Sequence, residues 1–128
     1  MFLTKERDYA MRVVRSLCNM EKQTVKSISA KEYVPLDFAY KILKKLEHSG
    51  IAHSTRGKNG GYRLSKTPNN ISMLDVLLAM DTRLFISEDI ESNNGNKGKS
   101  YCRISEEFGA LQGVWVKSLQ EKTLDMLA

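Results

Sequence analysis

The stretch from Arg56 to Leu64 gathers basic residues and glycines in a pattern suited to binding phosphate. Three glycines fall within five residues, and glycine tolerates positive φ angles and lets a backbone come close to its ligand. Arg56, Lys58 and Arg63 place positive charge on or beside this turn. Taken alone, the stretch is equally well explained as a solvated basic turn. Together with the elements before it, it predicts a hairpin that reaches a phosphate backbone.

The sequence holds no arrangement typical of an enzyme. It lacks a set of nucleophile, base and orienting group, a phosphate-binding P-loop, and paired carboxylates in a recognisable pocket. The two cysteines, Cys18 and Cys102, cannot form a disulfide framework and lack the spacing of a zinc site. Cys18 falls in an apolar helical stripe and is expected to be a small buried residue. His48 and His53 are expected to contact phosphate or solvent.

Charge is unevenly distributed along the 128 residues. Residues 1–67 hold fourteen Lys and Arg against six Asp and Glu, a net charge of +8, whereas residues 68–128 hold six against nine, a net charge of −3. A strongly basic half is typical of a surface that binds a polyanion. A membrane surface is the weaker alternative, because no basic amphipathic helix with an exposed aromatic face is present. We therefore expect the basic half to bind double-stranded DNA.

Neither a signal peptide nor a membrane span is predicted. Residues 1–8 carry charge where a signal peptide needs its apolar segment. The most apolar run, residues 73–80, is interrupted by Asp75. We expect a cytoplasmic protein with no membrane partner.

Hydrophobic periodicity predicts three helices in the basic half. The first begins after the N-cap Thr4 and reaches residue 19 or 20, and the second covers about residues 25–32. The third opens at Pro35 and stops at Gly50. Two helices joined by a short turn, the second basic on its outer face, form a helix-turn-helix that places the second helix in the major groove. The outer face of this second helix carries Asp37, Tyr40, Lys41 and Lys44. The alternative is that this polar face only contacts solvent.

Two short runs, residues 51–55 and 62–65, flank the glycine-rich turn and are predicted to pair as strands. Three helices followed by a hairpin make a winged helix, so the expected fold class is mainly α with a small β-hairpin. The hairpin tip, here called the wing, is expected to lie against the DNA backbone or in the minor groove beside the third helix. The residues expected to contact DNA are Lys26, Ser27, Pro35, Leu36, Asp37, Tyr40, Lys41, Lys44, Arg56, Gly57, Lys58, Asn59, Gly60, Gly61 and Tyr62.

The acidic half is predicted to hold a fourth helix, a loop and a long helix. Ser72 caps a helix over about residues 73–81, which closes a DNA-binding domain of residues 1–81. Residues 82–102 are mostly polar and contain glycines, which predicts a flexible, sensor-type loop. Residues 103–128 carry a wider apolar stripe than one small core needs, so we expect them to form a homodimer that fits a palindromic site. The expected dimer contacts are Ile104, Phe108, Leu111, Trp115 and Leu119.

With these elements in place, the chain resembles the Rrf2 family of bacterial winged helix-turn-helix regulators, whose members include iron–sulfur cluster and nitric-oxide-responsive repressors. The resemblance covers nearly the whole chain and rests above all on Arg56-Gly57-x-x-Gly60-Gly61-Tyr62-x-Leu64. It is supported by residues 3–5 and 8–10, by residues 43–46 ahead of Gly50-Ile51, and more weakly by residues 71–76, 111–115 and 123–124.

The resemblance implies a homodimeric transcription regulator in which Arg56 enters the minor groove and the start of the third helix reads the major groove. Where the family often has Tyr-Leu-Glu, this chain has Phe38-Ala39-Tyr40, so the usual acidic base-reading residue is missing. A tyrosine can bond a phosphate or contact a thymine methyl group. Lys41 or Lys44 can reach guanine or only the backbone.

The resemblance also directs attention to an iron–sulfur cluster. Many relatives hold one with three cysteines in the loop before the long helix and a fourth ligand from the same dimer, whereas this chain offers only Cys102. Asp8 matches an acidic ligand of certain relatives, although an aspartate in a first helical turn is favoured by the helix dipole in any case. We expect no cofactor. Two alternatives stay open, a cluster at Cys102 and Asp8 and a redox-reactive Cys102 thiol.

The function predicted is that of a DNA-binding transcriptional regulator, a repressor acting as a homodimer and answering a small-molecule or protein effector. The alternative from another class is a winged-helix module that binds a partner protein through its helix faces. The net charge of +8 on residues 1–67 favours DNA.

Overall fold

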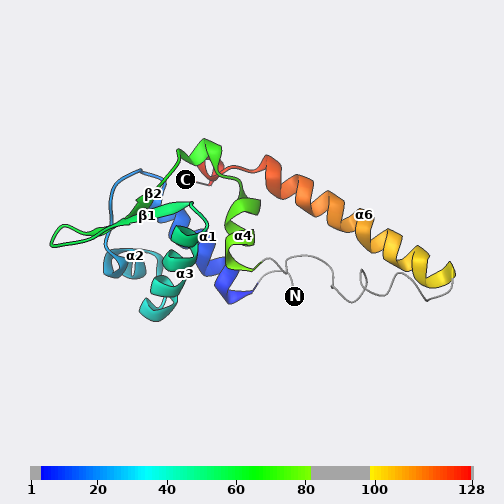
Figure 1. Ribbon diagram of the computed structural model, residues 1–128, viewed down its shortest axis with the longest axis horizontal. Coiled ribbons are helices and arrows are strands. Elements are labelled where there is room, and N and C mark those ends of the chain that lie inside the picture. The colour runs from blue at the N-terminus through cyan, green and yellow to red at the C-terminus, as the bar shows by residue number, and fades with distance from the viewer. Residues whose placement is uncertain (1–3, 82–98, 128) are drawn as a thin grey trace.

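The chain forms a group of packed helices with a two-stranded hairpin on one side and a long helix on the other (Figure 1). The computed structural model describes residues 4–81 and 99–127. The antiparallel hairpin and the helices before it form a winged helix, which confirms the predicted fold class. The elements in order are α1 (Lys5–Leu17), α2 (Val25–Glu32), α3 (Leu36–His48), β1 (Ala52–Thr55), β2 (Gly61–Leu64), the 3-10 helix η1 (Pro68–Asn70), α4 (Met73–Met80), α6 (Lys99–Glu121) and the 3-10 helix η2 (Leu124–Met126).

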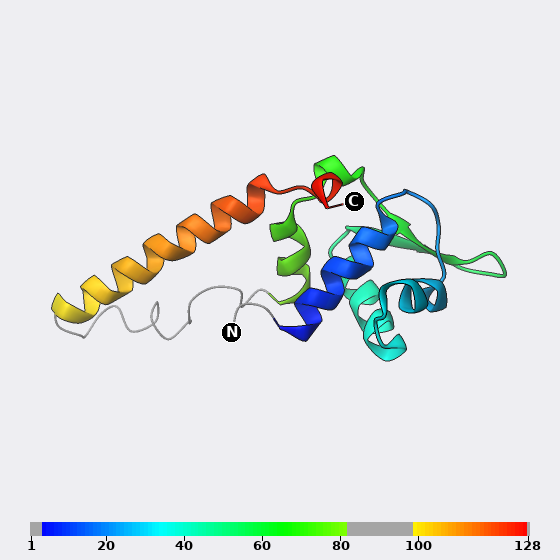
Figure 2. The same cartoon turned by 180° about the vertical axis from the view of Figure 1, so that it is seen from behind.

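Helix α1 is the centre of the packing. It contacts α2, α3 and α4, and Figure 2 shows it crossing between α4 and the pair formed by α2 and α3. The rings of Tyr9 on α1 and Phe38 on α3 meet edge to face with centroids 5.3 Å apart. These contacts fix α3 on its apolar side, so its polar face is turned away from the core. The fully buried side chains of the two helices are Ala10, Val13, Val14, Leu17, Ala39, Ile42, Leu43 and Leu46.

Hydroxyl side chains open three of the helices. Thr4 Oγ1 accepts the Arg7 amide at 3.3 Å, and Thr24 Oγ1 accepts the Ser27 amide at 3.1 Å. Ser72 forms a capping box, in which its hydroxyl accepts the Asp75 amide and the Asp75 carboxylate accepts the Ser72 amide, both at 3.0 Å. Each cap satisfies a first-turn amide that has no partner inside its helix. The predictions of Thr4 and Ser72 as N-caps are confirmed.

Gly50 ends the third helix as predicted. Its φ of +84° is a conformation that costs glycine little, and the Ile51 amide then donates to the Leu46 carbonyl at 2.9 Å. This turn sends the chain directly into β1. The hairpin register pairs Ala52 with Leu64 and Ser54 with Tyr62.

The C-terminal region differs from the prediction at both ends of the long helix. Helix α6 begins at Lys99 and not at residue 103, because residues 99–102 contain neither proline nor glycine to stop a helix. It ends at Glu121 and does not reach residue 128. Thr123 is extended and forms a β-bridge with Ser72, and Leu124 is fully buried in the core around α1. The rest of the predicted loop, residues 82–98, lies outside the described residues.

Candidate nucleic-acid interface

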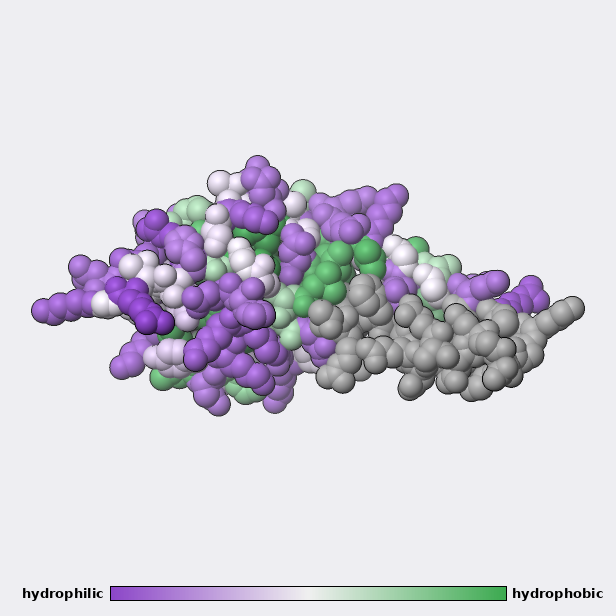
Figure 3. Space-filling model, in the orientation of Figure 1, coloured by the Kyte–Doolittle hydropathy of each residue, from purple (hydrophilic) through white to green (hydrophobic). Residues whose placement is uncertain are grey.

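A groove lies between α3, the wing and the start of α2. It has a volume of about 480 Å³, and three cations from two elements line it: Lys44 of α3, and Arg56 and Lys58 of the wing. Positive groups placed along one groove are suited to follow a phosphate backbone. Figure 3 shows hydrophilic surface over the wing, at the left end of the view. The groove is lined by Thr24, Val25, Lys44, Glu47, Ser54, Thr55, Arg56, Gly57, Lys58, Gly60, Gly61 and Tyr62.

The wing is thin because glycines occupy positions where another residue would be strained or would clash. Gly57 has a φ of +106°, and a Cβ at Gly60 would lie 2.5 Å from the Thr55 carbonyl oxygen. The Gly60 amide donates to the Gly57 carbonyl at 2.9 Å and closes the turn. The sequence predicted this hairpin because such conformations and close approaches require glycine.

Gln23 holds the base of the wing, a role that sequence reasoning missed. The backbone amide of Gln23 donates to the backbone carbonyl of Tyr62 at 2.9 Å, and the backbone amide of Tyr62 donates to the backbone carbonyl of Gln23 at 2.8 Å. The Gln23 side chain is buried and donates to the Ser16 carbonyl at 2.5 Å. Strand β2 is therefore bonded to β1 on one edge and to Gln23 on the other. A lone glutamine between two helices carries no pattern that predicts such a contact.

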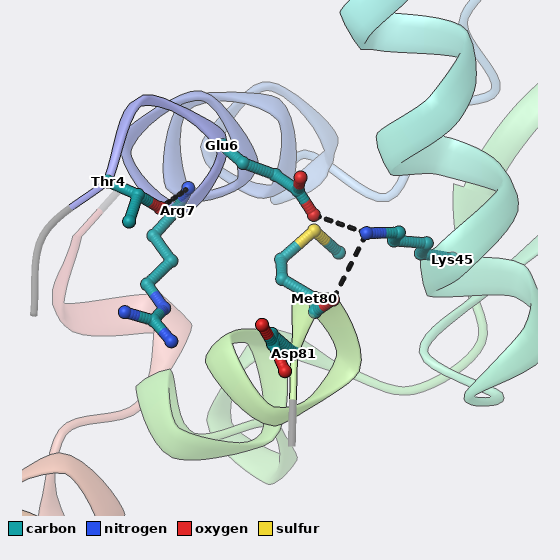
Figure 4. A pocket seen from close by; sticks show the side chains of 6 residues that line it. All are labelled: Thr4, Glu6, Arg7, Lys45, Met80 and Asp81. Atoms are coloured by element: carbon teal, nitrogen blue, oxygen red, sulfur yellow. Dashed lines mark hydrogen bonds and ion pairs between the residues drawn. The ribbon is translucent and has the colours of Figure 1, made fainter. Parts of the chain in front are cut away.

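The basic face predicted for α3 is divided between two neighbours. Lys44 lines the groove with the wing, whereas Lys41 Nζ lies 3.9 Å from Glu6 Oε2 of α1. Lys45 Nζ lies 2.5 Å from Glu6 Oε1 and donates to the Met80 carbonyl at 3.1 Å, as Figure 4 shows. Lys45 thus joins α3 to α1 and to the end of α4, in a second cavity of about 340 Å³. These bonds hold α3 against α1 and the end of α4.

The remaining predicted DNA contacts lie on the surface outside the groove. All of them are exposed, and Tyr40 and Leu36 expose 44% and 39% of their surface. They belong to the first turn of α2, the start and first half of α3 and the wing tip, and they do not line the groove: Lys26, Ser27, Pro35, Leu36, Asp37, Tyr40, Lys41 and Asn59. Sequence reasoning missed other lining residues, namely Thr24, Val25, Glu47, Ser54 and Thr55. The sequence pattern predicts the helices and strands that hold these residues, but it does not show which neighbouring element each side chain faces.

The Tyr62 hydroxyl in the groove has a raised pKa. Partial burial raises the pKa of its hydroxyl, and the carboxylate of Glu47 raises it further. The phenol therefore stays neutral at physiological pH and keeps its proton for donation.

Within the described residues, Cys18 and Asp8 are not gathered into a site for an iron–sulfur cluster. Such clusters are held by about four thiolate-type ligands. The Cys18 Sγ donates to the Val14 carbonyl at 3.2 Å, and the Asp8 carboxylate pairs with Arg12 at 3.2 Å. Within residues 4–81 and 99–127, no group of three or more His, Cys, Asp or Glu is placed to hold a metal ion. The backbone of Cys102 lies in α6, and its side chain is outside the described part of the chain.

Cys18 is expected to react slowly with thiol reagents at neutral pH. Burial, and secondly the Asp125 carboxylate, raise the pKa of this thiol above its ordinary 9.0, so little reactive thiolate forms. In a Cys102→Ser variant, the rate of labelling by a chromogenic disulfide should be low at pH 7 and should still be rising with pH at about pH 9, where an ordinary thiol begins to level off. In denaturant the same variant should label quickly. Rapid labelling of the folded variant at neutral pH would contradict this assignment.

Helix α6 carries several large apolar side chains that are exposed. Figure 1 shows it leading away from the other helices, and Figure 3 shows apolar surface between α4 and α6. Its last turns pack on α4, where Leu119 and Val116 meet Leu74 and Leu77. No helix in the described ranges is both long and apolar enough to cross a bilayer. The apolar residues of α6 that expose 40% or more of their surface are Ile104, Phe108, Leu111, Val114 and Trp115.

Both the sequence and the fold match known proteins. Residues 3–128 match the Rrf2 family, described as iron-dependent transcriptional regulators. The Lactococcus lactis protein YffB, which carries the name of an HTH-type transcriptional regulator, is 32% identical over 115 residues, or 84% of this chain and 74% of YffB. The oxidized form of CymR from Staphylococcus aureus shares the fold with a TM-score of 0.76 and 22% identity, over 100% of this chain and 96% of CymR. IscR from T. potens matches with a TM-score of 0.68 and 20% identity, over 98% of this chain and 85% of IscR.

The family match spans nearly the whole chain, and the relatives in sequence and in fold agree with it. The groove between a recognition-type helix and a basic wing is what a DNA-binding regulator needs. The chain belongs to the Rrf2 family, whose members are transcriptional regulators with a DNA-binding fold and not enzymes.

Proposed function

We propose that this chain is a repressor that binds a palindromic operator as a homodimer in the cytoplasm. The observation that carries the proposal is the groove of about 480 Å³ in which Lys44 of α3 and Arg56 and Lys58 of the wing face one space. Helix α3 then enters the major groove of double-stranded DNA, and the wing follows the backbone into the adjacent minor groove. Exposed side chains with a donor contribute phosphate contacts that set the register, namely Lys26, Ser27, Tyr40, Lys41 and Asn59.

The homodimer is supported by the exposed apolar stripe of α6. Phe108 exposes 40% of its surface and Trp115 exposes 44%, and both are large side chains that favour burial. A second copy of α6 offers the same stripe, which suits the self-complementary contact of a twofold dimer. Two copies of α3 then face two halves of a palindrome.

Arg56→Ala tests the proposed function. The test uses a duplex that the wild-type protein selects from a random-sequence pool. We expect the affinity of the variant for this duplex to be lower by about tenfold or more. The reason is that the narrow minor groove concentrates negative potential, which an inserted arginine meets. Affinity is measured by gel shift at fixed salt, and sedimentation should show that the variant keeps the mass of the wild-type dimer.

Arg63→Ala is the matched control, because it removes the same charge from an exposed position on β2 that does not line the groove. We expect a clearly smaller loss of affinity. Equal losses for Arg56→Ala and Arg63→Ala would show that only net charge matters. A wild-type chain that enriches no duplex, but retains a partner protein through α3, would replace this proposal with the protein-interaction module.

A further inference from the structure

One carboxylate stands among the cations of the groove. Glu47, in the last turn of α3, lines the same space as Lys44, Arg56 and Lys58. A negative charge beside the expected path of a phosphate backbone opposes binding to DNA of any sequence. If the groove served only to attract DNA, a neutral side chain would serve better at this position.

The contacts of Glu47 supply a reason for its presence. The Ser54 hydroxyl of β1 donates to Glu47 Oε1 at 2.9 Å. Ser54 pairs across the hairpin with Tyr62 of β2, and the Tyr62 hydroxyl also interacts with the Glu47 carboxylate. One side chain of α3 is therefore hydrogen-bonded to β1 and lies beside the Tyr62 hydroxyl of β2.

We propose that Glu47 is a specificity-determining residue, which positions the wing relative to α3 and whose charge weakens binding to DNA of arbitrary sequence. The proposal rests on the proposed function, since it concerns how that DNA interface discriminates. Non-specific binding comes almost entirely from phosphate electrostatics, so the charge of Glu47 lowers it directly. Specific binding needs α3 and the wing to contact DNA together. A wing that is already fixed beside α3 loses less conformational entropy on binding, and this gain offsets the repulsion between Glu47 and phosphate. The ratio of the two affinities therefore rises.

Two variants separate the effect of the Glu47 charge from the effect of its hydrogen bond to Ser54. Glu47→Gln keeps an oxygen that can accept from Ser54 and removes the negative charge, whereas Ser54→Ala keeps the charge and removes one hydrogen bond. Each is compared with the wild type on the duplex selected from a random pool and on a scrambled duplex of equal length and composition. The measurements are made at low and at high salt. Glu121→Gln, at the exposed end of α6, is the control for an equal change in net charge outside the groove.

We expect Glu47→Gln to bind the scrambled duplex roughly threefold more tightly at low salt, and this gain should shrink at high salt because the charge is screened. The selected-to-scrambled ratio should fall. Ser54→Ala should lose affinity for the selected duplex only, and Glu121→Gln should match the wild type.

Three results would overturn the proposal. The first is an unchanged affinity of Glu47→Gln for the scrambled duplex at low salt, and the second is a gain that does not depend on salt. The third is an unchanged affinity of Ser54→Ala for the selected duplex. In all three cases a wild-type chain that still discriminates leaves the proposed function standing, whereas a wild-type chain that binds no DNA removes both.

Discussion

Gly61→Ala is expected to destabilise the folded protein by about 1–3 kcal/mol and to weaken DNA binding by about tenfold or more. A Cβ at position 61 would lie 2.5 Å from the carbonyl oxygen and 2.9 Å from the carbonyl carbon of Gln23. These are backbone atoms held by the paired hydrogen bonds between Gln23 and Tyr62, so no side chain can turn away to make room. Either that bridge opens or β2 shifts, and in both cases the wing leaves its place beside α3.

Thermal unfolding and gel shift on the selected duplex measure the two effects. Asn59→Ala is the control for stability, because residue 59 is exposed at the wing tip and has no positive φ that alanine would strain. Its midpoint of unfolding should stay at the wild-type value. A Gly61→Ala protein as stable as the wild type would mean that the hairpin and Gln23 separate at little cost.

Leu124→Ala is expected to lower the free energy of unfolding by about 2–5 kcal/mol. Leu124 is fully buried in the core with residues of α1 and α3, although it follows α6 in the chain. Its amide also donates to the Ile71 carbonyl at 3.0 Å, which holds the backbone in place when the side chain is shortened. The surroundings therefore cannot collapse fully, and a cavity remains where the leucine was.

Urea denaturation followed by circular dichroism gives the free energy of unfolding for this comparison. Met126→Ala serves as the control, because Met126 lies in the same 3-10 helix and exposes 65% of its surface. It should change stability by less than about 0.5 kcal/mol. A Leu124→Ala loss as small as this would show that the core of α1 to α4 does not depend on the C-terminal segment.

The sequence predicted best those features that depend on local chemistry. Local backbone geometry requires particular residue types at the glycines of the wing, at the cap Ser72 and at the helix end Gly50. These features can therefore be predicted from residue type alone. The apolar stripes of α1 and α3 are visible for the same reason, because helical spacing decides which residues share a face.

Features that depend on a distant partner could not be predicted in this way. Spacing placed Lys41 and Lys44 on one polar face, but only the fold shows that Glu6 lies beside the first and the wing beside the second. Leu124 has the same apolar character whether it continues a helix or enters a core. The contacts of Glu47 could not be predicted either, because nothing in its neighbourhood along the chain indicates Ser54 or Tyr62.

The burial of Leu124 also determines when the fold can be completed. The Cys18 Sγ donates to the Leu124 carbonyl across 106 residues of sequence. Contacts between residues so far apart are expected to form late, because closing so long a loop costs entropy before the contact stabilises the fold. During synthesis on the ribosome, α1 to α4 can assemble early, but their core stays open until the residues beyond Lys122 have emerged. The core of α1 to α4 is therefore expected to reach full stability only after α6 has been made.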